Sequence, residues 1–143
     1  MPLKMKPGKA KKNSTPWLSI SKTSFKKRLR AWRWGQFAEK LAAYYLRLKG
    51  YHILHHRFAS PVGEIDLIAK RNDSLVFVEV KARKTKAIAA ESISPHQKRR
   101  IERAGEYFLQ NWKGPSPQTI RFDVVLIAPW RWPEHIRSAW MTS

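Results

Sequence analysis

The stretch Gly63–Arg83, GEIDLIAKRNDSLVFVEVKAR, contains two short apolar runs separated by RND. Turn-forming residues between two such runs predict a β-hairpin. The second run, Leu75–Val80, is apolar on both faces, which is typical of a central strand covered on each side. The first strand nevertheless carries Asp66, and the second carries Glu79 and Lys81. Charged side chains are rarely buried without a partner, so these three residues indicate a site.

The segments around the hairpin predict a single mixed α/β domain. The expected elements are a helix from Gly35 that ends before Gly50, a strand over 51–58, the hairpin, a helix over Pro95–Trp112 with Ser94 as N-cap, and a strand ended by Pro129. The order helix, three strands, helix, strand predicts helices packed on a mixed β-sheet. The length of 143 residues suits one compact domain with one core.

Charge is concentrated near the N-terminus. The chain carries a net charge of +19, and residues 1–38 hold 11 of its 29 Lys and Arg but none of its 10 Asp and Glu. We expect a basic, mostly disordered arm over 1–34, followed by the domain over 35–143. Phe25, Leu29 and Trp32 recur at helical spacing, so the last part of the arm is a candidate helix. The arm either raises solubility or contacts phosphates, and such a charge predicts a nucleic-acid partner ahead of an anionic membrane.

Several classes of protein are disfavoured by what the sequence lacks. It has no cysteine, and hence no disulfide framework or thiolate metal site. We see neither an apolar stretch of membrane-spanning length nor a signal peptide, so we expect a soluble cytoplasmic protein. His52, His55 and His56 fall on both faces of one strand, and we expect them to face solvent rather than bind zinc.

Asp66 and Glu79 are expected to converge, since they lie on hairpin partners near the end away from the turn. Two neighbouring carboxylates repel each other, and a divalent cation removes that repulsion. Oxygen ligands alone suit Mg²⁺ or Mn²⁺. Lys81 shares a face with Glu79, where it can position a water or stabilise charge on a phosphoryl oxygen. The set fits metal-assisted phosphodiester hydrolysis, and the alternative is a structural ion pair between Glu79 and Lys81.

Asp66 followed by EVK at 79–81 resembles the D…(D/E)xK signature of the PD-(D/E)XK nuclease superfamily. The segments GQFAEKLAAYYLRLKGY, GEIDLIA, VFVEVKAR, QKRRIERAGEYFL and RFDVVLI resemble the bacterial YraN family. The likeness covers roughly residues 35–128 and does not extend to the arm. It implies a restriction-endonuclease-like fold and a divalent-metal-dependent endonuclease that acts on DNA, including branched or junction DNA.

The resemblance also implies roles for individual residues. Asp66 and Glu79 would bind the metal, with the Val80 backbone carbonyl as a third ligand. Lys81 would orient or polarise the attacking water. Glu39 matches an acidic position that junction-resolving members place beside the metal, although a solvated helix face is an alternative.

Two further positions are implied on either side of this set. Gln97 matches a polar position that some superfamily nucleases direct at the site, and Lys98 is an equal candidate. Glu64 faces the same way as Asp66 and is expected to support it. The alternative to an enzyme is a non-catalytic nucleic-acid-binding protein, and the sequence leaves the oligomeric state open, with a homodimer as one option.

Two features outside the signature also lead to expectations. Asp123 follows Arg121 by two residues, so we expect a structural ion pair rather than a further catalytic acid. The late aromatic residues are Trp112, Trp130, Trp132 and Trp140. With Arg131 and Arg137 they could stack on unpaired bases or form a subunit contact, and we expect burial against the sheet.

Overall fold

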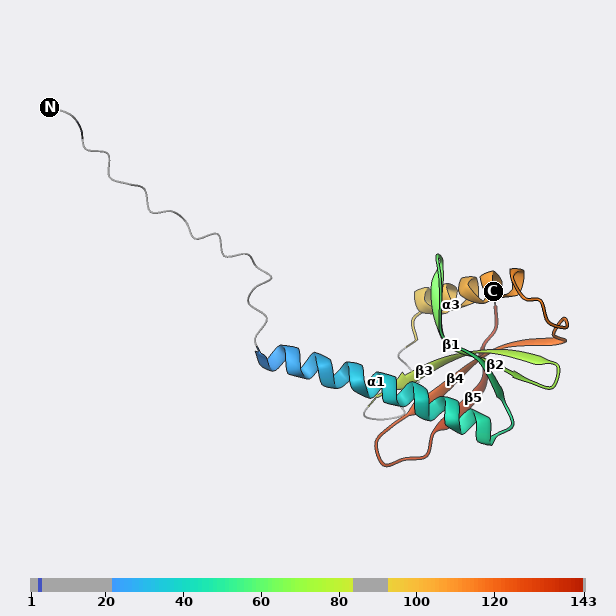
Figure 1. The fold of residues 1–143 in the computed structure, drawn as a ribbon, viewed down its shortest axis with the longest axis horizontal. Coiled ribbons are helices and arrows are strands. Elements are labelled where there is room, and N and C mark those ends of the chain that lie inside the picture. Colours follow the sequence, from blue (N-terminus) through green and yellow to red (C-terminus); the bar gives the residue numbers. More distant parts are fainter. Residues whose placement is uncertain (1–2, 4–21, 84–92, 143) are drawn as a thin grey trace.

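The computed structural model describes residues 3, 22–83 and 93–142, and it confirms the mixed α/β fold (Figure 1). The elements are α1 (Lys22–Leu48), β1 (His52–Ser60), β2 (Gly63–Arg71), β3 (Ser74–Ala82), α3 (Pro95–Gln110), β4 (Thr119–Ile127) and β5 (Glu134–Trp140). The loop expected directly after β3 lies mostly outside the described residues. In the described part of the chain, no helix is both long and apolar enough to cross a membrane.

The five strands form one sheet in the order β1-β2-β3-β4-β5. The β2–β3 hairpin turns at Asn72 and Asp73, as the RND motif predicts, and Asn72 adopts a φ of 51°. β3 and β4 pair in parallel, whereas every other neighbouring pair is antiparallel. Since α3 connects the two parallel strands, it must cross over one face of the sheet.

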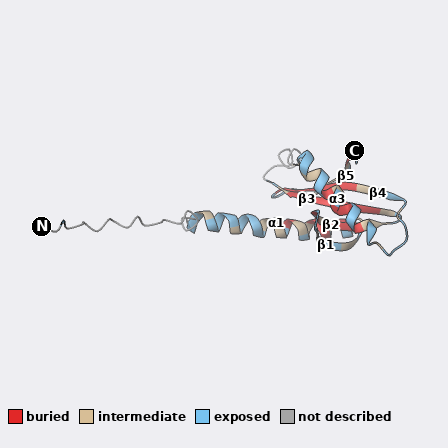
Figure 2. Cartoon of the chain, turned by 90° about the horizontal axis from the view of Figure 1, so that it is seen from above, coloured by how far each residue is buried: buried red, intermediate tan, exposed pale blue. Residues whose placement is uncertain are grey.

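Among the described residues, one helix covers each face of the sheet, and each of these helices has its own apolar cluster. On the α3 face, Ile101, Ala104 and Phe108 pack with residues that include Phe77 and Phe122. On the α1 face, small residues let the helix approach the strands closely; the cluster contains Ala38, Ala42, Ala43, Leu46, Val76, Val78, Val125 and Ile127. The central strands β3 and β4 therefore lie between the two helices, and most of their residues are buried (red in Figure 2).

The start of α3 and the end of α1 follow local sequence rules. Ser94 caps α3 by accepting a hydrogen bond from the Gln97 N–H, and Pro95 opens the helix. Gly50 ends α1 with a φ of 89°, where the Tyr51 N–H donates to the Leu46 carbonyl and the Gly50 N–H donates to the Arg47 carbonyl. This pair of bonds is the Schellman motif. These termini were predicted correctly because the signals are contiguous in sequence.

The first helix starts earlier than the expected domain boundary. It begins at Lys22 and continues through Gly35 without a break, so part of the expected arm is helical, as the spacing of Phe25, Leu29 and Trp32 indicates. This first half of α1 is largely exposed and extends away from the sheet in Figures 1 and 2. The rest of the arm lies almost entirely outside the described residues.

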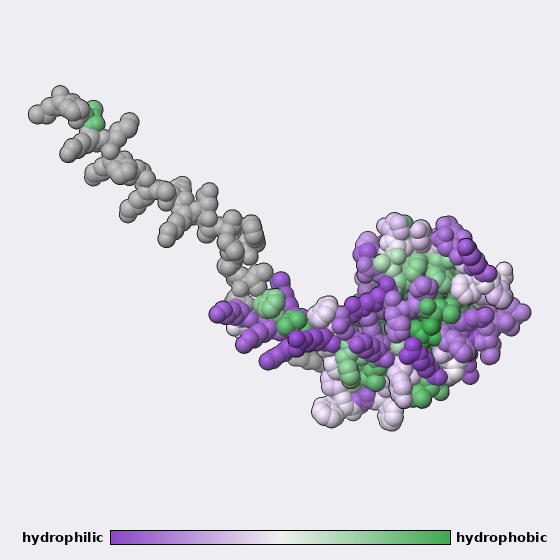
Figure 3. Space-filling view, in the orientation of Figure 1, coloured by the Kyte–Doolittle hydropathy of each residue, from purple (hydrophilic) through white to green (hydrophobic). Residues whose placement is uncertain are grey.

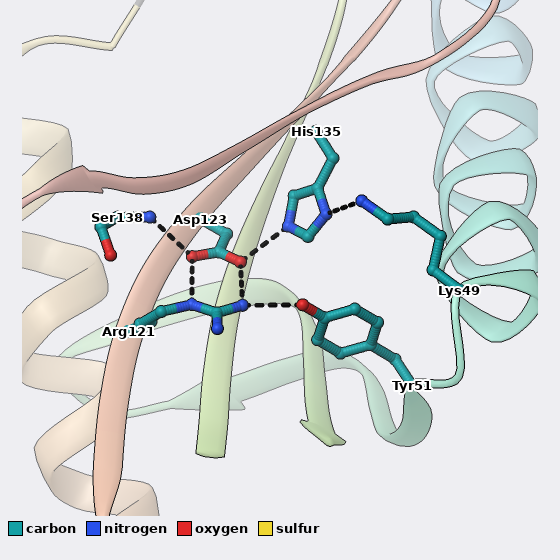
Figure 4. A network of polar contacts seen from close by, with 6 residues as sticks. All are labelled: Lys49, Tyr51, Arg121, Asp123, His135 and Ser138. Carbon is teal, nitrogen blue, oxygen red and sulfur yellow. Dashed lines mark hydrogen bonds and ion pairs between the residues drawn. The ribbon is translucent and has the colours of Figure 1, made fainter. Parts of the chain in front are cut away.

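The last strand, β5, was not expected from the sequence, and a buried polar network around Asp123 holds it (Figure 4). Arg121 donates to both carboxylate oxygens of Asp123, at 3.1 and 2.8 Å, which confirms the structural ion pair. From β5, His135 Nε2 lies 2.7 Å from Asp123 Oδ2 and the Ser138 N–H donates to Oδ1. Asp123 itself is fully buried. β5 therefore packs over a carboxylate that is already paired with Arg121 of the same strand, β4.

Candidate active site

The two acidic residues of the hairpin meet where the β2–β3 ladder ends. The last pair in register is Leu67 with Val78, and the next residues along the two strands are Asp66 and Glu79. Asp66 Oδ2 accepts a hydrogen bond of 2.8 Å from the Val80 N–H. The Asp66 carboxylate thus accepts a hydrogen bond from the backbone of β3, which holds this side chain against the neighbouring strand. The convergence that alternation along the strands predicted is present.

Glu79 is held from two directions. Lys81 Nζ lies 3.2 Å from Glu79 Oε1, and the side chains of both residues are less than a tenth exposed. Gln97 Nε2 on α3 donates to the same oxygen at 3.0 Å. Gln97 therefore reaches the site as expected, whereas its alternative Lys98 lies over the ring of Trp140. The Glu79–Lys81 pair exists, as both the catalytic interpretation and the ion-pair alternative require.

The electrostatics of the site are those of two neighbouring carboxyl groups, the buried Glu79 and the half-buried Asp66. Burial raises the pKa of Asp66, the negative charge of Glu79 raises it further, and the hydrogen bond from Val80 lowers it only in part, so that the pKa stands at about 8. A carboxyl with such a pKa carries a proton near neutral pH unless a cation is supplied. Strongly shifted groups of this kind are typical of functional sites.

Two hollows meet at the acid pair. The first, of about 170 Å³, lies toward α3 and is lined by Glu64, Asp66, Glu79, Gln97, Arg100 and Ile101. The second, of about 270 Å³, lies toward α1, and its lining includes Trp34, Glu39, Asp66, Glu79 and Val80. Only Asp66 and Glu79 line both. The pair is therefore open from the α3 side and from the α1 side.

The two outlying acids lie where the sequence suggested, each in one of these hollows. Glu39 of α1 contacts Arg57 of β1 at 2.6 Å, and its charge also raises the pKa of Asp66. Glu64 is exposed and lines the hollow toward α3. The partner Arg57 was not foreseen; it lies on a strand whose position beside α1 is visible only in the fold.

Oxygen atoms dominate the possible metal ligands. Asp66 and Glu79 offer carboxylates, and Val80, the expected source of a backbone ligand, lines the same hollow. Within the described ranges, no group of three or more His, Cys, Asp and Glu residues is arranged to hold a metal. A two-carboxylate set completed by a carbonyl and water is typical of Mg²⁺ and Mn²⁺ rather than zinc. His52, His55 and His56 are all exposed, as expected.

Close backbone packing fixes the position of this edge of the sheet. Gly63 begins β2, and a Cβ built on it would lie 2.5 Å from the Arg100 carbonyl oxygen of α3. Only a residue without a side chain allows this approach. No local sequence signal indicates this role of Gly63, because it depends on the position of α3.

The burial expected for the late tryptophans is correct in only some cases. Trp140 is 9% exposed and stacks on Phe122 at 5.4 Å, and Trp112 is half-buried beside Phe108. Trp130 is fully exposed and Trp132 is 82% exposed, so for these two the expectation was wrong. Both lie in the segment between β4 and β5, outside the strands of the sheet.

Comparison with known proteins identifies the family. Residues 38–127 match the family model of UPF0102, described as an uncharacterised protein family. A UPF0102 protein of Parvibaculum lavamentivorans is 48% identical over 112 residues, covering 78% of this chain and 84% of that protein. UPF0102 proteins of Bartonella tribocorum and Paramagnetospirillum magneticum are 47% and 50% identical over 111 and 114 residues, covering 78% and 77% of this chain and 85% and 88% of theirs. The resemblance to the YraN family is thereby confirmed, and the chain belongs to UPF0102.

Proposed function

We propose that the protein is a divalent-metal-dependent nuclease that hydrolyses phosphodiester bonds of DNA. The observation that carries this proposal is the convergence of Asp66 and Glu79 at the open end of the hairpin, with Lys81 and Gln97 both on Glu79. A purely structural ion pair needs one acid and one base. Here the buried Glu79 and the half-buried Asp66 share a place with a single ammonium group, and ionising both carboxyls is costly unless a further cation is bound.

The residues present fit Mg²⁺ or Mn²⁺. Asp66 and Glu79 would hold the metal, with the Val80 carbonyl as third ligand. When bound, such an ion supplies Lewis acidity toward a phosphoryl oxygen and lowers the pKa of water. The raised pKa of Asp66 supports this assignment. Without a cation the carboxyl group is protonated near neutral pH, and a bound divalent cation would favour its negatively charged form.

The chain's own side chains would perform the remaining tasks. Lys81 is a donor without a lone pair, so it cannot be a ligand while charged and instead donates to a water or a phosphoryl oxygen. Gln97 keeps the Glu79 carboxylate oriented through its amide. Glu39, held by Arg57, lies across the hollow toward α1, where it can accept a proton or a hydrogen bond from a bound water.

The charge distribution supports a nucleic-acid substrate. Exposed cations line the projecting half of α1: Lys22, Lys26, Lys27, Arg28, Arg30 and Arg33. The hydrophilic surface that they form is visible along this helix in Figure 3. No acidic residue occurs before Glu39, so a phosphate backbone lying along this helix would meet one sign of charge until it reaches the acid pair.

A second candidate is a non-catalytic nucleic-acid-binding protein with the same fold. One observation favours it, since Lys81 and Gln97 already satisfy Glu79 Oε1 without any metal. This candidate makes the opposite prediction for metal binding. Neither Asp66→Asn nor Glu79→Gln would then alter the response of the protein to Mg²⁺ or Mn²⁺.

The test combines metal binding with cleavage. Linear, flapped and branched DNAs are incubated with Mn²⁺ and the wild-type protein, Asp66→Asn or Glu79→Gln. Asp73→Asn, in the exposed β2–β3 turn, is the matched control. We expect Mn²⁺ to raise the melting temperature and support cleavage in the wild type and the control, and to do neither in the two site variants. Equal cleavage by all four proteins would exclude this active site, and no metal response in any would favour the binding protein.

A further inference from the structure

The two exposed tryptophans lie beside α1 and form one wall of a groove. The segment after β4, which contains Trp130, Arg131 and Trp132, borders a groove of about 590 Å³. Its other wall is α1, through Trp34, Phe37 and Leu41. Trp34 and Phe37 stack on each other with centroids 5.8 Å apart. In Figure 1 this segment runs alongside α1, on the side of the sheet away from α3.

The sequence of this segment holds the rings outside the core. It reads Pro-Trp-Arg-Trp-Pro from Pro129 to Pro133, so a proline precedes the first tryptophan and follows the second. Each proline fixes its own φ, and the residue before a proline is restricted as well. Trp130 has a φ of 60°, which is unusual for a bulky residue. Two large rings are thus presented to solvent on a stiff loop, which lowers the entropy cost of binding.

Cations surround the aromatic groove. Arg131 lines it between the two tryptophans. On α1, Arg30 precedes Trp34 by four residues, Arg33 precedes Phe37 by four, and Lys40 follows Phe37 by three, and all three cations are exposed. Residues at these spacings are neighbours on a helix surface. The groove therefore joins planar aromatic rings with positive charge, the combination that proteins use to bind single-stranded nucleic acid.

The groove also leads to the acid pair. Trp34 lines both the aromatic groove and the hollow that contains Glu39, Asp66 and Glu79. One indole thus separates a place for stacked rings from the proposed place of bond cleavage. A strand that lies in the groove can continue past Trp34 into the hollow that contains the carboxylates.

We propose that the aromatic groove binds unpaired nucleobases of the substrate by stacking, with Trp130 and Trp132 as the principal contacts. This inference rests on the proposed function and narrows its substrate class to nucleic acid with a single-stranded portion, such as a flap, an open junction or an end. Stacking is tolerant of sequence because every base has an aromatic face. Arg131 would neutralise the phosphate between successive stacked bases.

Charge argues against a second copy of the chain as the occupant. A two-fold interface places the same surface on both subunits, so it would bring the cations Arg30, Arg33 and Arg131 of both copies into one interface. Like charges brought together in this way oppose association. An anionic lipid surface would tolerate the cations, but a flat membrane laid on the groove would also cover Glu39 and the acid pair that Trp34 adjoins.

The experiment measures binding without cleavage. Fluorescence anisotropy of a labelled single-stranded oligothymidine and of a blunt duplex is recorded in EDTA. The proteins are the wild type, the double variant Trp130→Leu/Trp132→Leu and the double variant Trp130→Phe/Trp132→Phe. Trp32→Leu is the matched control, because Trp32 is exposed on α1 but does not line the groove. Circular dichroism and melting temperature confirm that each variant is folded.

We expect the leucine variant to lose about tenfold or more in affinity for the single strand, the scale for removing one base stack. Its affinity for the duplex should stay within about twofold of the wild-type value, because duplex binding depends on contacts with the phosphate backbone. The phenylalanine variant and Trp32→Leu should bind the single strand nearly as the wild type does. Leucine retains apolar character, so the contrast with phenylalanine isolates stacking from hydrophobic contact.

Three results would overturn the inference. The first is unchanged single-strand binding by the leucine variant. The second is a wild-type dimer in sedimentation equilibrium that the leucine variant dissociates while single-strand binding is kept. The third is capture of the wild type by phosphatidylglycerol vesicles that the leucine variant loses while its single-strand binding is kept. Because binding in EDTA requires no cleavage, failure of stacking and failure of the nuclease proposal are separate outcomes.

Discussion

Gln97 of α3 donates a hydrogen bond of 3.0 Å from Nε2 to Glu79 Oε1 of β3. This contact links α3 directly to the acid pair. The Ser94 cap and Pro95 fix the first turn of α3, so the direction of Gln97 is set locally. The amide therefore holds one oxygen of the Glu79 carboxylate.

Gln97→Leu should slow metal-dependent cleavage by roughly tenfold while leaving the melting temperature within a few degrees. The expected cause is a Glu79 carboxylate that has lost one of its two donors and is less well oriented. The measurement is single-turnover cleavage with Mn²⁺ held at saturation. Lys98→Leu is the control, since Lys98 contacts Trp140 rather than the site. A larger fall in cleavage rate for Lys98→Leu than for Gln97→Leu would mean that Lys98, and not Gln97, supports the site.

Lys81→Ala should leave divalent-metal affinity largely intact and slow hydrolysis by about a hundredfold, the scale for loss of one electrostatic stabiliser. Lys81→Arg should rescue only in part, because the guanidinium differs in shape and reach. Metal titration, melting temperature and single-turnover cleavage are measured on the same preparations. Lower stability together with an unchanged cleavage rate would mean that Lys81 is only the cation of a buried ion pair.

The projecting half of α1 should contribute to affinity by binding phosphates. Lys22→Gln/Lys26→Gln removes two exposed charges one helical turn apart. The slope of log K against log salt should flatten by about 0.9 for each duplex phosphate that the variant no longer neutralises. Arg47→Gln/Lys113→Gln removes the same charge from elsewhere on the surface and should leave the slope unchanged. Identical slopes for both variants would mean that this half of α1 adds charge but does not touch the DNA.

The parts of the fold that were predicted correctly depend on contiguous residues. The RND turn, the Ser94–Pro95 helix start and the Gly50 terminus each require only neighbours in sequence. The convergence of Asp66 and Glu79 was also accessible, because a hairpin brings known positions together. Gln97 came from the family resemblance, and periodicity alone did not separate it from Lys98.

What was missed depends on interactions between distant segments. β5 carries a left-handed residue at Ser138, with a φ of 47°, and its hold on Asp123 spans 12 to 15 residues. No period-two pattern marks such a strand. Trp130 and Trp132 were expected to be buried against the sheet, but the prolines on either side of them keep the loop away from it. The hydrophobicity of the sequence does not reveal this restriction of the backbone by the two prolines.

Two glycine substitutions should change stability in opposite directions. Gly63→Ala places a Cβ against the Arg100 carbonyl oxygen and should destabilise the protein by about 1–3 kcal/mol. Gly35→Ala meets nothing within 4 Å in the interior of α1 and should stabilise it by about 0.5–1 kcal/mol. Denaturant unfolding measures both. Equal effects of the two substitutions would contradict the close packing of α3 against the start of β2.

The Asp123 network should make folding stability depend on pH in the acid range. Burial alone raises the pKa of Asp123, but hydrogen bonds from His135, Arg121 and the Ser138 N–H outweigh it and lower the pKa from 3.8 to about 2. The Lys49 ammonium has only donors, so His135 Nδ1 accepts from it and Nε2–H donates to the carboxylate. The folded protein therefore binds a proton at Asp123 less readily than the unfolded chain does.

A carboxyl with a lowered pKa in the folded state contributes stability that is fully present above its unfolded value. That contribution disappears as the pH falls from about 4 to about 2 and amounts to about 2 kcal/mol. Asp123→Asn leaves Arg121 without its carboxylate and should cost about 3 kcal/mol near neutral pH. The difference in unfolding free energy between wild type and Asp123→Asn should shrink by about 2 kcal/mol across that window. Urea unfolding at a series of pH values measures this difference. The exposed Asp73→Asn should show no such change, and a constant difference for Asp123→Asn would mean that the network does not depend on the charge of Asp123.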